Sequence, residues 1–233
     1  MLMLAFETSA KAASVALFRD GVLVGESYQN TGLTHSQTLM VMAEDMLKQC
    51  GHSADQVTHV AVAAGPGSFT GVRIGVAAAK GFAWGKALPC YGVSTLESMA
   101  LGLGAYDGIV CAVMDARRNQ VYNALFRAEK GGLYRLTEDR AIALADLSRE
   151  LAELEGPVFL VGDGTEVAHR GMAELAQRLV IPQSGRMHQR AVGVGYAALA
   201  HMDSDPGDAE ALQPNYLRLS QAEREKLERQ GKA

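Results

Sequence analysis

Residues 60–86 read VAVAAGPGSFTGVRIGVAAAKGFAWGK, and this stretch decides the fold. Residues 60–64 are short and apolar, which is typical of a strand that is covered on both faces. Gly65, Pro66 and Gly67 predict a tight turn, because glycine permits backbone angles closed to other residues and proline fixes one dihedral. Ser68 or Thr70 can then cap a helix that continues to about residue 85. The stretch therefore predicts a strand, a turn and a helix.

The predicted helix is unusual because small residues recur along it. Gly71, Gly75 and Ala79 fall four apart and form one stripe, although each glycine costs a helix roughly 1 kcal/mol relative to alanine. Such a stripe indicates that another part of the molecule, or of a partner, approaches the helix closely. One interpretation is that the stripe only lets the helix lie close to its own sheet.

The other interpretation is a protein–protein interface. Ile74, Ala78 and Phe82 already supply a face for the sheet, so Val72 and Val76 are expected on the outside. An earlier predicted helix, at residues 34–50, leaves further apolar residues off its core face. Together these side chains would form an apolar strip with a charged rim, which is the usual composition of an interface. The predicted interface residues are Met40, Val41, Glu44, Gly71, Val72, Arg73, Gly75, Val76, Ala79, Lys80 and Ala83.

The rest of the chain predicts an α/β protein of two lobes, each with a mixed sheet and flanking helices. Apolar runs at 2–6, 13–19 and 22–28 predict three strands, and Asp20–Gly21 predicts a hairpin turn between the last two. The first half then continues as helix, strand, helix, strand, helix. Ser94 is expected to cap the last of these helices, at 95–103. Strands and helices recur more loosely after residue 108, with a strand expected at 158–161 and a helix, capped by Thr165, to residue 179. We place the lobe boundary between residues 104 and 105, which gives lobes of 1–104 and 105–233.

Composition narrows the class of protein. With 48% hydrophobic and 21% charged residues among 233, the chain can bury a substantial core. Its net charge of -4 argues against a protein that grips nucleic acid alone through a basic face. Three widely spaced cysteines indicate reduced thiols. The N-terminus does not read as a signal peptide, and no apolar run approaches the roughly 20 residues of a membrane span. We expect a cytoplasmic protein.

Three motifs carry a resemblance to a known family: GPGSFTGVRIGVAAAKG at 65–81, DARRNQVYNALF at 115–126 and PNYLRLSQAEREK at 214–226. Over nearly its whole length the chain resembles the TsaB family, also called YeaZ. The resemblance implies the actin-like ATPase fold. It also implies a non-catalytic partner of TsaD, in making threonylcarbamoyladenosine next to the anticodon of tRNAs that read codons beginning with A. It further implies TsaE in a larger complex, tRNA bound mainly through the complex, and a homodimer through the same two helices when TsaD is absent.

Metal-dependent catalysis is not expected, and we assign neither a catalytic residue nor a metal ligand. The catalytic relative TsaD carries a His-x-x-x-His pair after the corresponding strand, and Thr95 and Met99 align with those histidines. A hydroxyl and a thioether make a poor site for zinc or for a hard metal ion. The six histidines of the chain form no HxxxH pair elsewhere.

The resemblance to actin-like proteins also marks two turns that hold a nucleotide in that fold. They contain Thr8 and Ser9, and Gly162, Asp163 and Gly164. Neither turn has a lysine or a GxxxxGK[ST] pattern, and Glu7 stands where such ATPases place an aspartate. A turn without nucleotide is therefore favoured, and weak ATP or ADP binding at a subunit interface stays open.

Other residues leave competing functions open. Asp115 is either a base of a stand-alone ATPase or kinase, or a carboxylate paired with a neighbouring arginine. Arg117, Arg118 and Asn119 form a short basic turn that suits contact with tRNA or with TsaD. The Thr34-His35-Ser36 sequence suggests a peptidase, but adjacent residues rarely form a catalytic pair.

Overall fold

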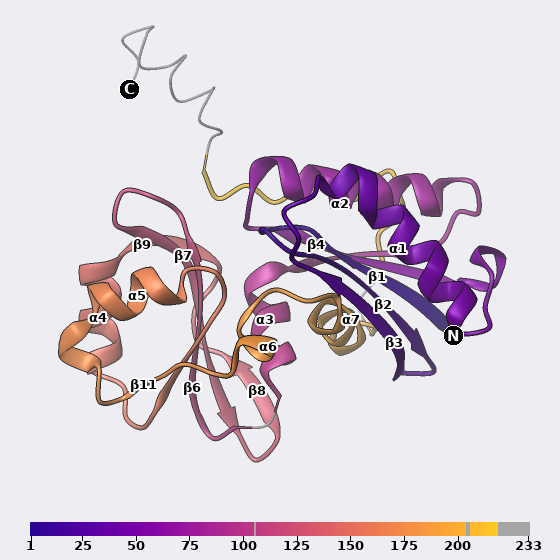
Figure 1. Cartoon of the computed structure of the whole chain (residues 1–233). Coiled ribbons are helices and arrows are strands. Elements are labelled where there is room, and N and C mark those ends of the chain that lie inside the picture. The colour runs from indigo at the N-terminus through magenta and orange to yellow at the C-terminus, as the bar shows by residue number, and fades with distance from the viewer. Residues whose placement is uncertain (105, 204–205, 219–233) are drawn as a thin grey trace, which may run out of the picture.

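The computed structural model describes residues 1–104, 106–203 and 206–218, and the chain forms two lobes (Figure 1). The first lobe is built on a five-stranded sheet in the order β3-β2-β1-β4-β5. Strands β1, β4 and β5 are parallel, and β2 and β3 add an antiparallel hairpin at one edge. The strands are β1 (Leu2–Glu7), β2 (Ala13–Arg19), β3 (Val22–Gln29), β4 (His59–Gly65) and β5 (Cys90–Ser94).

The second lobe repeats this plan with another mixed sheet, in the order β11-β10-β6-β7-β8, with β9 paired to β7. Strands β6, β10 and β11 are parallel, and β7 is antiparallel to β6. The predicted class of two lobes with mixed sheets is confirmed. The strands are β6 (Gly108–Asp115), β7 (Gln120–Glu129), β8 (Gly132–Arg135), β9 (Arg140–Ala143), β10 (Val158–Val161) and β11 (Leu179–Val180).

Helices cover both faces of each sheet. In Figure 1, α1 and α2 lie along one side of the first sheet and α7 lies along the other. Helix α3 packs on the second sheet and against α7, while α4 and α5 cover the opposite face of that sheet. The helices are α1 (His35–Gln49), α2 (Phe69–Trp84), α3 (Thr95–Leu103), α4 (Leu144–Ala152), α5 (Thr165–Gly171), α6 (Ser184–Met187) and α7 (Ala191–Ala200), with short 3₁₀ helices at Ala54–Gln56 and Ala173–Leu175.

The position of α7 corrects the predicted lobe boundary. Although α7 belongs to the predicted second lobe, its Val194, Ala197 and Ala198 pack on Met3 and Phe18 of the first sheet. The physical reason is that every residue of β1 is buried, so the first sheet needs cover on the face opposite α1 and α2. The division near residue 104 thus separates the two sheets, while the chain returns to the first lobe after residue 190.

The orientation of α2 corrects the prediction for its outer face. Ser68 caps the helix as expected, accepting a hydrogen bond from the Gly71 amide at 3.3 Å. A Cβ at Gly71 would lie 2.1 Å from the Thr8 carbonyl oxygen, and one at Gly75 would lie 2.5 Å from Thr8 Oγ1. The small stripe therefore faces the turn after β1, within the same chain. The buried residues of α2 are Gly71, Val72, Gly75, Val76, Ala79 and Ala83, all of which had been expected on the partner-binding face.

Candidate functional sites

The outward side of α1 and α2 carries exposed apolar side chains. Met40 and Val41 of α1 are 41% and 56% exposed, and Trp84 of α2 is 65% exposed. Ala77 and Gly81 lie along the same exposed stripe of α2, so the backbone is accessible to close packing there. We call Met40, Val41, Glu44, Ala77, Gly81 and Trp84 the two-helix face. This face keeps Met40, Val41 and Glu44 from the predicted interface. On α2, the exposed Ala77, Gly81 and Trp84 take the place of the predicted residues that are buried.

Arg73 and Lys80, which were expected on the charged rim of that face, hold the chain's own C-terminal segment (residues 206–218). Arg73 Nε donates to the Tyr216 hydroxyl at 2.8 Å, and its guanidinium lies 3.8 Å from the centre of the Phe69 ring. Lys80 Nζ donates to the carbonyl oxygens of residues 210 and 212, each at 3.2 Å. Both cations therefore fix the C-terminal segment along α2.

The C-terminal segment connects the two lobes. Its Asn215 amide donates to the Ala64 carbonyl at 2.6 Å, beside the turn that begins α2. Gly65 permits this approach, since a Cβ there would lie 2.3 Å from the Asn215 carbonyl oxygen. Further along, Arg218 Nη1 donates to the Ala116 carbonyl of the second lobe at 2.8 Å. No periodic pattern predicts this path, because the segment is neither helix nor strand.

Glu7 is buried between the lobes at the end of β1. The Ser9 amide donates to its Oε1 at 2.5 Å, while Oε2 has no hydrogen-bond partner among the residues described. Burial raises the pKa of Glu7 to about 7, and the nearby charge of Asp163 adds to the effect. A carboxylate with this environment is held largely as the neutral acid below that pH.

The predicted nucleotide-binding residues surround Glu7 but are engaged by the protein itself. Thr8 Oγ1 donates to the Gly71 carbonyl at 2.8 Å, and Asp163 Oδ1 accepts from Gln189 Nε2 at 3.0 Å. Ser9 is buried, and its hydroxyl has no partner in the described part of the chain. Burial also raises the pKa of Asp163. Two buried acids fit the phosphates of a nucleotide poorly, because they offer no compensating positive charge.

Neighbouring backbone also occupies the space beside the glycines of the second turn, Gly162 and Gly164. A Cβ at Gly162 would lie 2.1 Å from the Val113 carbonyl oxygen, and one at Gly164 would lie 2.9 Å from Met114. These close contacts fix the loop after β10 on the end of β6. The glycines are therefore explained by packing within the second lobe.

The turn between β6 and β7 carries exposed charged side chains. Asp115 is exposed, and its Oδ1 accepts from the Arg117 backbone amide at 2.7 Å, so the predicted pairing with an arginine guanidinium is not what holds it. Arg117, Arg118 and Asn119 have φ of 65°, 55° and 56°, which are left-handed values that cost non-glycine residues energy. Arg117 and Arg118 are exposed.

The other residues considered as functional candidates from the sequence have structural roles. The His35 ring hydrogen-bonds through Nε2 to the Ala10 carbonyl at 2.8 Å. Thr95 and Met99 are buried, and Met99 contacts Gly162. Within the described ranges, His, Cys, Asp and Glu form no group of three that could hold a metal ion. No helix in that part of the chain is long and apolar enough to cross a membrane.

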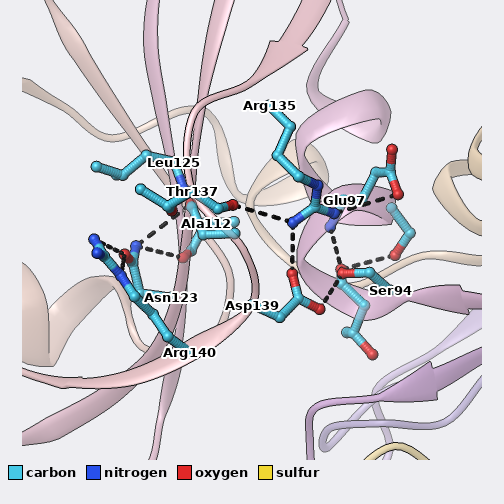
Figure 2. A network of polar contacts seen from close by, with 12 residues as sticks. Ser94, Glu97, Ala112, Asn123, Leu125, Arg135, Thr137, Asp139 and Arg140 are labelled. Atoms are coloured by element: carbon cyan, nitrogen blue, oxygen red, sulfur yellow. Dashed lines mark hydrogen bonds and ion pairs between the residues drawn. The ribbon is translucent and has the colours of Figure 1, made fainter.

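A network of ion pairs fixes α3 to the second sheet, and sequence reasoning missed it (Figure 2). Arg135 binds Asp139 at 2.8 Å and Glu97 at 3.3 Å, and its guanidinium lies over the Phe126 ring. Ser94, the predicted cap of α3, accepts from the Glu97 amide and donates to Asp139 at 2.5 Å. Arg135 and Asp139 stand four apart outside any helix, which is why the sequence offers no periodic signal for them.

Comparison with known proteins gives a consistent family. Residues 29–226 match the family model described as TsaD: tRNA N6-adenosine threonylcarbamoyltransferase. The tRNA threonylcarbamoyladenosine biosynthesis protein TsaB of Bacillus subtilis is 33% identical over 232 residues, which cover 99% of this chain and 100% of that protein. TsaB of Escherichia coli is 38% identical over 167 residues, covering 70% and 72%.

Solved structures agree with the fold. YeaZ from Pseudomonas aeruginosa superposes with a TM-score of 0.73 at 27% identity, covering 93% of this chain and 99% of that one. Component A of the (R)-2-hydroxyglutaryl-CoA dehydratase of Acidaminococcus fermentans reaches 0.50 at 11% identity, over 87% and 99%, and shows the fold alone. The predicted two-lobed, actin-like α/β fold is confirmed.

Proposed function

The chain belongs to the TsaB (YeaZ) family, and we propose that it supports tRNA threonylcarbamoyladenosine biosynthesis as a non-catalytic subunit that binds TsaD. The names of its relatives support the pathway. The match to the TsaD family model supports a partner with a similar fold, against which equivalent helices can pack. In the same proposal the subunit joins TsaE in a larger complex, serves tRNAs that read codons beginning with A, and forms a homodimer when TsaD is absent.

The non-catalytic role is supported by what occupies the centre of the molecule. Glu7 and Asp163 are buried with raised pKa values, and Thr95 and Met99 replace a metal-binding pair. No nucleotide beside Glu7 is part of the proposal, since the two buried acids Glu7 and Asp163 fit phosphates poorly. A stand-alone ATPase or kinase, or a peptidase, is the alternative, and steady turnover of ATP or of a peptide by the isolated chain would contradict the proposal.

The observation that carries the proposal is the two-helix face. Met40, Val41 and Trp84 expose apolar area on neighbouring helices that cover one side of a sheet, and Ala77 and Gly81 leave room between them for a facing helix. Packing of this face against the equivalent helices of TsaD would bury the exposed side chains in a four-helix contact. The fold of the isolated chain does not depend on these exposed positions.

Mixing the purified chain with TsaD on analytical gel filtration tests this surface. Val41→Glu should abolish the heterodimer with the thermal melting curve of the chain nearly unchanged, and Gly81→Arg should abolish it without lowering the melting temperature, because both positions are exposed. Val22→Glu is the matched control, since Val22 is 67% exposed on β3 and lies outside the two-helix face. Heterodimer retained by both face variants would overturn the assignment. Gly75 belongs to the interface predicted from the sequence, but a substitution there cannot test binding, because Gly75 packs on Thr8 and the fold itself would be disturbed.

A further inference from the structure

Four arginines at the junction of the lobes carry charges that no acidic side chain of the described residues neutralises. They are Arg73, Arg117, Arg118 and Arg218. Arg73 contacts the Tyr216 phenol and the Phe69 ring, Arg218 bonds a backbone carbonyl, and Asp115 accepts from the backbone amide of Arg117, not from its guanidinium. Elsewhere in the described chain many arginines are paired with carboxylates, including Arg135, Arg140, Arg149, Arg170 and Arg190. Together with the exposed Asp115, these arginines leave the surface that they share positive in a protein with a net charge of -4.

Direct contacts and chain connectivity place these arginines along one continuous path. Arg73 lies on Phe69, whose ring stacks on Tyr216 with centres 4.8 Å apart. Tyr216 precedes Arg218 by two residues, and Arg218 binds the Ala116 carbonyl, directly before Arg117 and Arg118 in the chain. We call this path the arginine line: Phe69, Arg73, Arg117, Arg118, Tyr216 and Arg218.

The end of the arginine line is a fixed turn. The Ala116 amide donates to the Gln120 carbonyl at 3.1 Å, and the Gln120 amide returns a hydrogen bond to the Arg117 carbonyl at 3.2 Å. The Leu144 amide donates to the Asn119 carbonyl at 3.1 Å, which ties the turn to α4. The turn also contains the exposed carboxylate of Asp115. Because the line carries four arginines against this one carboxylate, the net charge of the line and turn together is positive.

We propose that the arginine line binds single-stranded RNA directly. Guanidinium groups at Arg117, Arg118 and Arg218 match the geometry of phosphate oxygens, and an arginine beside an aromatic ring is a stacking platform for an unpaired base. Tyr216 is 38% exposed and already stacks on Phe69, so its ring supplies that platform. The identity of the RNA as a tRNA rests on the proposed function, which assigns no direct RNA contact to this chain.

A fluorescein-labelled anticodon stem–loop of a tRNA that reads codons beginning with A is the probe, titrated with the full chain at two salt concentrations. The double variant Arg117→Ala/Arg118→Ala should bind about tenfold more weakly or worse, and its salt slope should fall by about two. Tyr216→Ala should lose roughly tenfold in affinity and keep its salt slope, because a stacking contact rather than a phosphate contact is removed.

The matched control is Arg149→Ala/Arg170→Ala, which removes two exposed arginines of the second lobe and should bind like the wild type. Unchanged binding by the Arg117/Arg118 variant, an equal loss by the control variant, or equal wild-type affinity for a fully paired duplex would each overturn the proposal. So would an Arg117→Ala/Arg118→Ala variant that loses TsaD on gel filtration but keeps the RNA, since the arginine line would then bind protein. If the wild-type chain forms no complex with TsaD, the proposed function fails while this titration still decides the RNA site.

Discussion

At the scale of single residues, Glu7 shows most clearly what the family resemblance could not supply. Its position at the end of β1 was expected, but its complete burial, with Asp163 of the second lobe nearby, is a property of the folded chain. Its pKa is raised above the value of 4.5 that it has in the unfolded chain, to about 7, mainly by desolvation. The folded state therefore holds a proton that the unfolded state has lost between these two values.

This difference predicts how stability depends on pH. Since the unfolded chain binds fewer protons than the folded chain between pH 4.5 and 7, stability falls as pH rises through that window. Glu7→Gln should remove the part of this dependence that Glu7 contributes, leaving the part from Asp163, and raise the free energy of unfolding at pH 8 by up to the order of 3 kcal/mol. Denaturant unfolding at pH 5 and pH 8 measures it, with exposed Glu153→Gln as control. An unaltered pH slope in Glu7→Gln would contradict the burial of Glu7.

Thr8 shows how contact with one residue determines which face of a helix is buried. The sequence of α2 contains two stripes of small or apolar residues, and each could face the sheet. Tertiary contact selects the stripe of Gly71 and Gly75, because only glycine fits against the Thr8 backbone and hydroxyl. Neighbouring turns were thus needed to choose between interpretations that the sequence left open.

At the scale of elements, most strands were predictable because their apolar runs are short and bounded by turn residues. Strand β10 and helix α3 have the predicted bounds, and β1 to β3 differ by a residue at most. The predicted helix over 165–179 was wrong, since α5 ends at Gly171 and is followed by a 3₁₀ turn and the short β11. A Cβ at Gly171 would lie 2.6 Å from the Leu144 side chain, so α5 ends where it meets α4.

Helix α2 supplies a paired prediction. Gly71→Ala should destabilise the chain by about 1–3 kcal/mol, because its Cβ would lie 2.1 Å from a backbone oxygen. Gly81→Ala, on the exposed side with nothing within 4 Å, should stabilise the same helix by up to about 1 kcal/mol. Urea unfolding of both variants checks the orientation of α2. Equal effects of the two substitutions would mean that the glycine stripe does not face Thr8.

At the scale of the whole molecule, the C-terminal segment is the feature that sequence reasoning placed least well. The motif at 214–226 was recognised, but its first part proved to lie along α2 and to reach the second lobe through Arg218. The last part of this motif, residues 219–226, lies outside the described residues. Neither periodicity nor composition marks an extended segment that is held by side chains from elsewhere, which explains why Arg73 and Lys80 were first assigned to a partner.

The central claim also concerns the whole molecule: this chain acts through the two-helix face and catalyses no reaction of its own. The most direct measurement is threonylcarbamoyladenosine formation on tRNA in a reconstituted reaction containing TsaD, TsaE and a TsaC-type protein, with and without this chain. We predict that modification requires the wild-type chain, is lost with Val41→Glu and persists with Val22→Glu. Modification that proceeds equally without the chain, or with Val41→Glu in its place, would contradict the account.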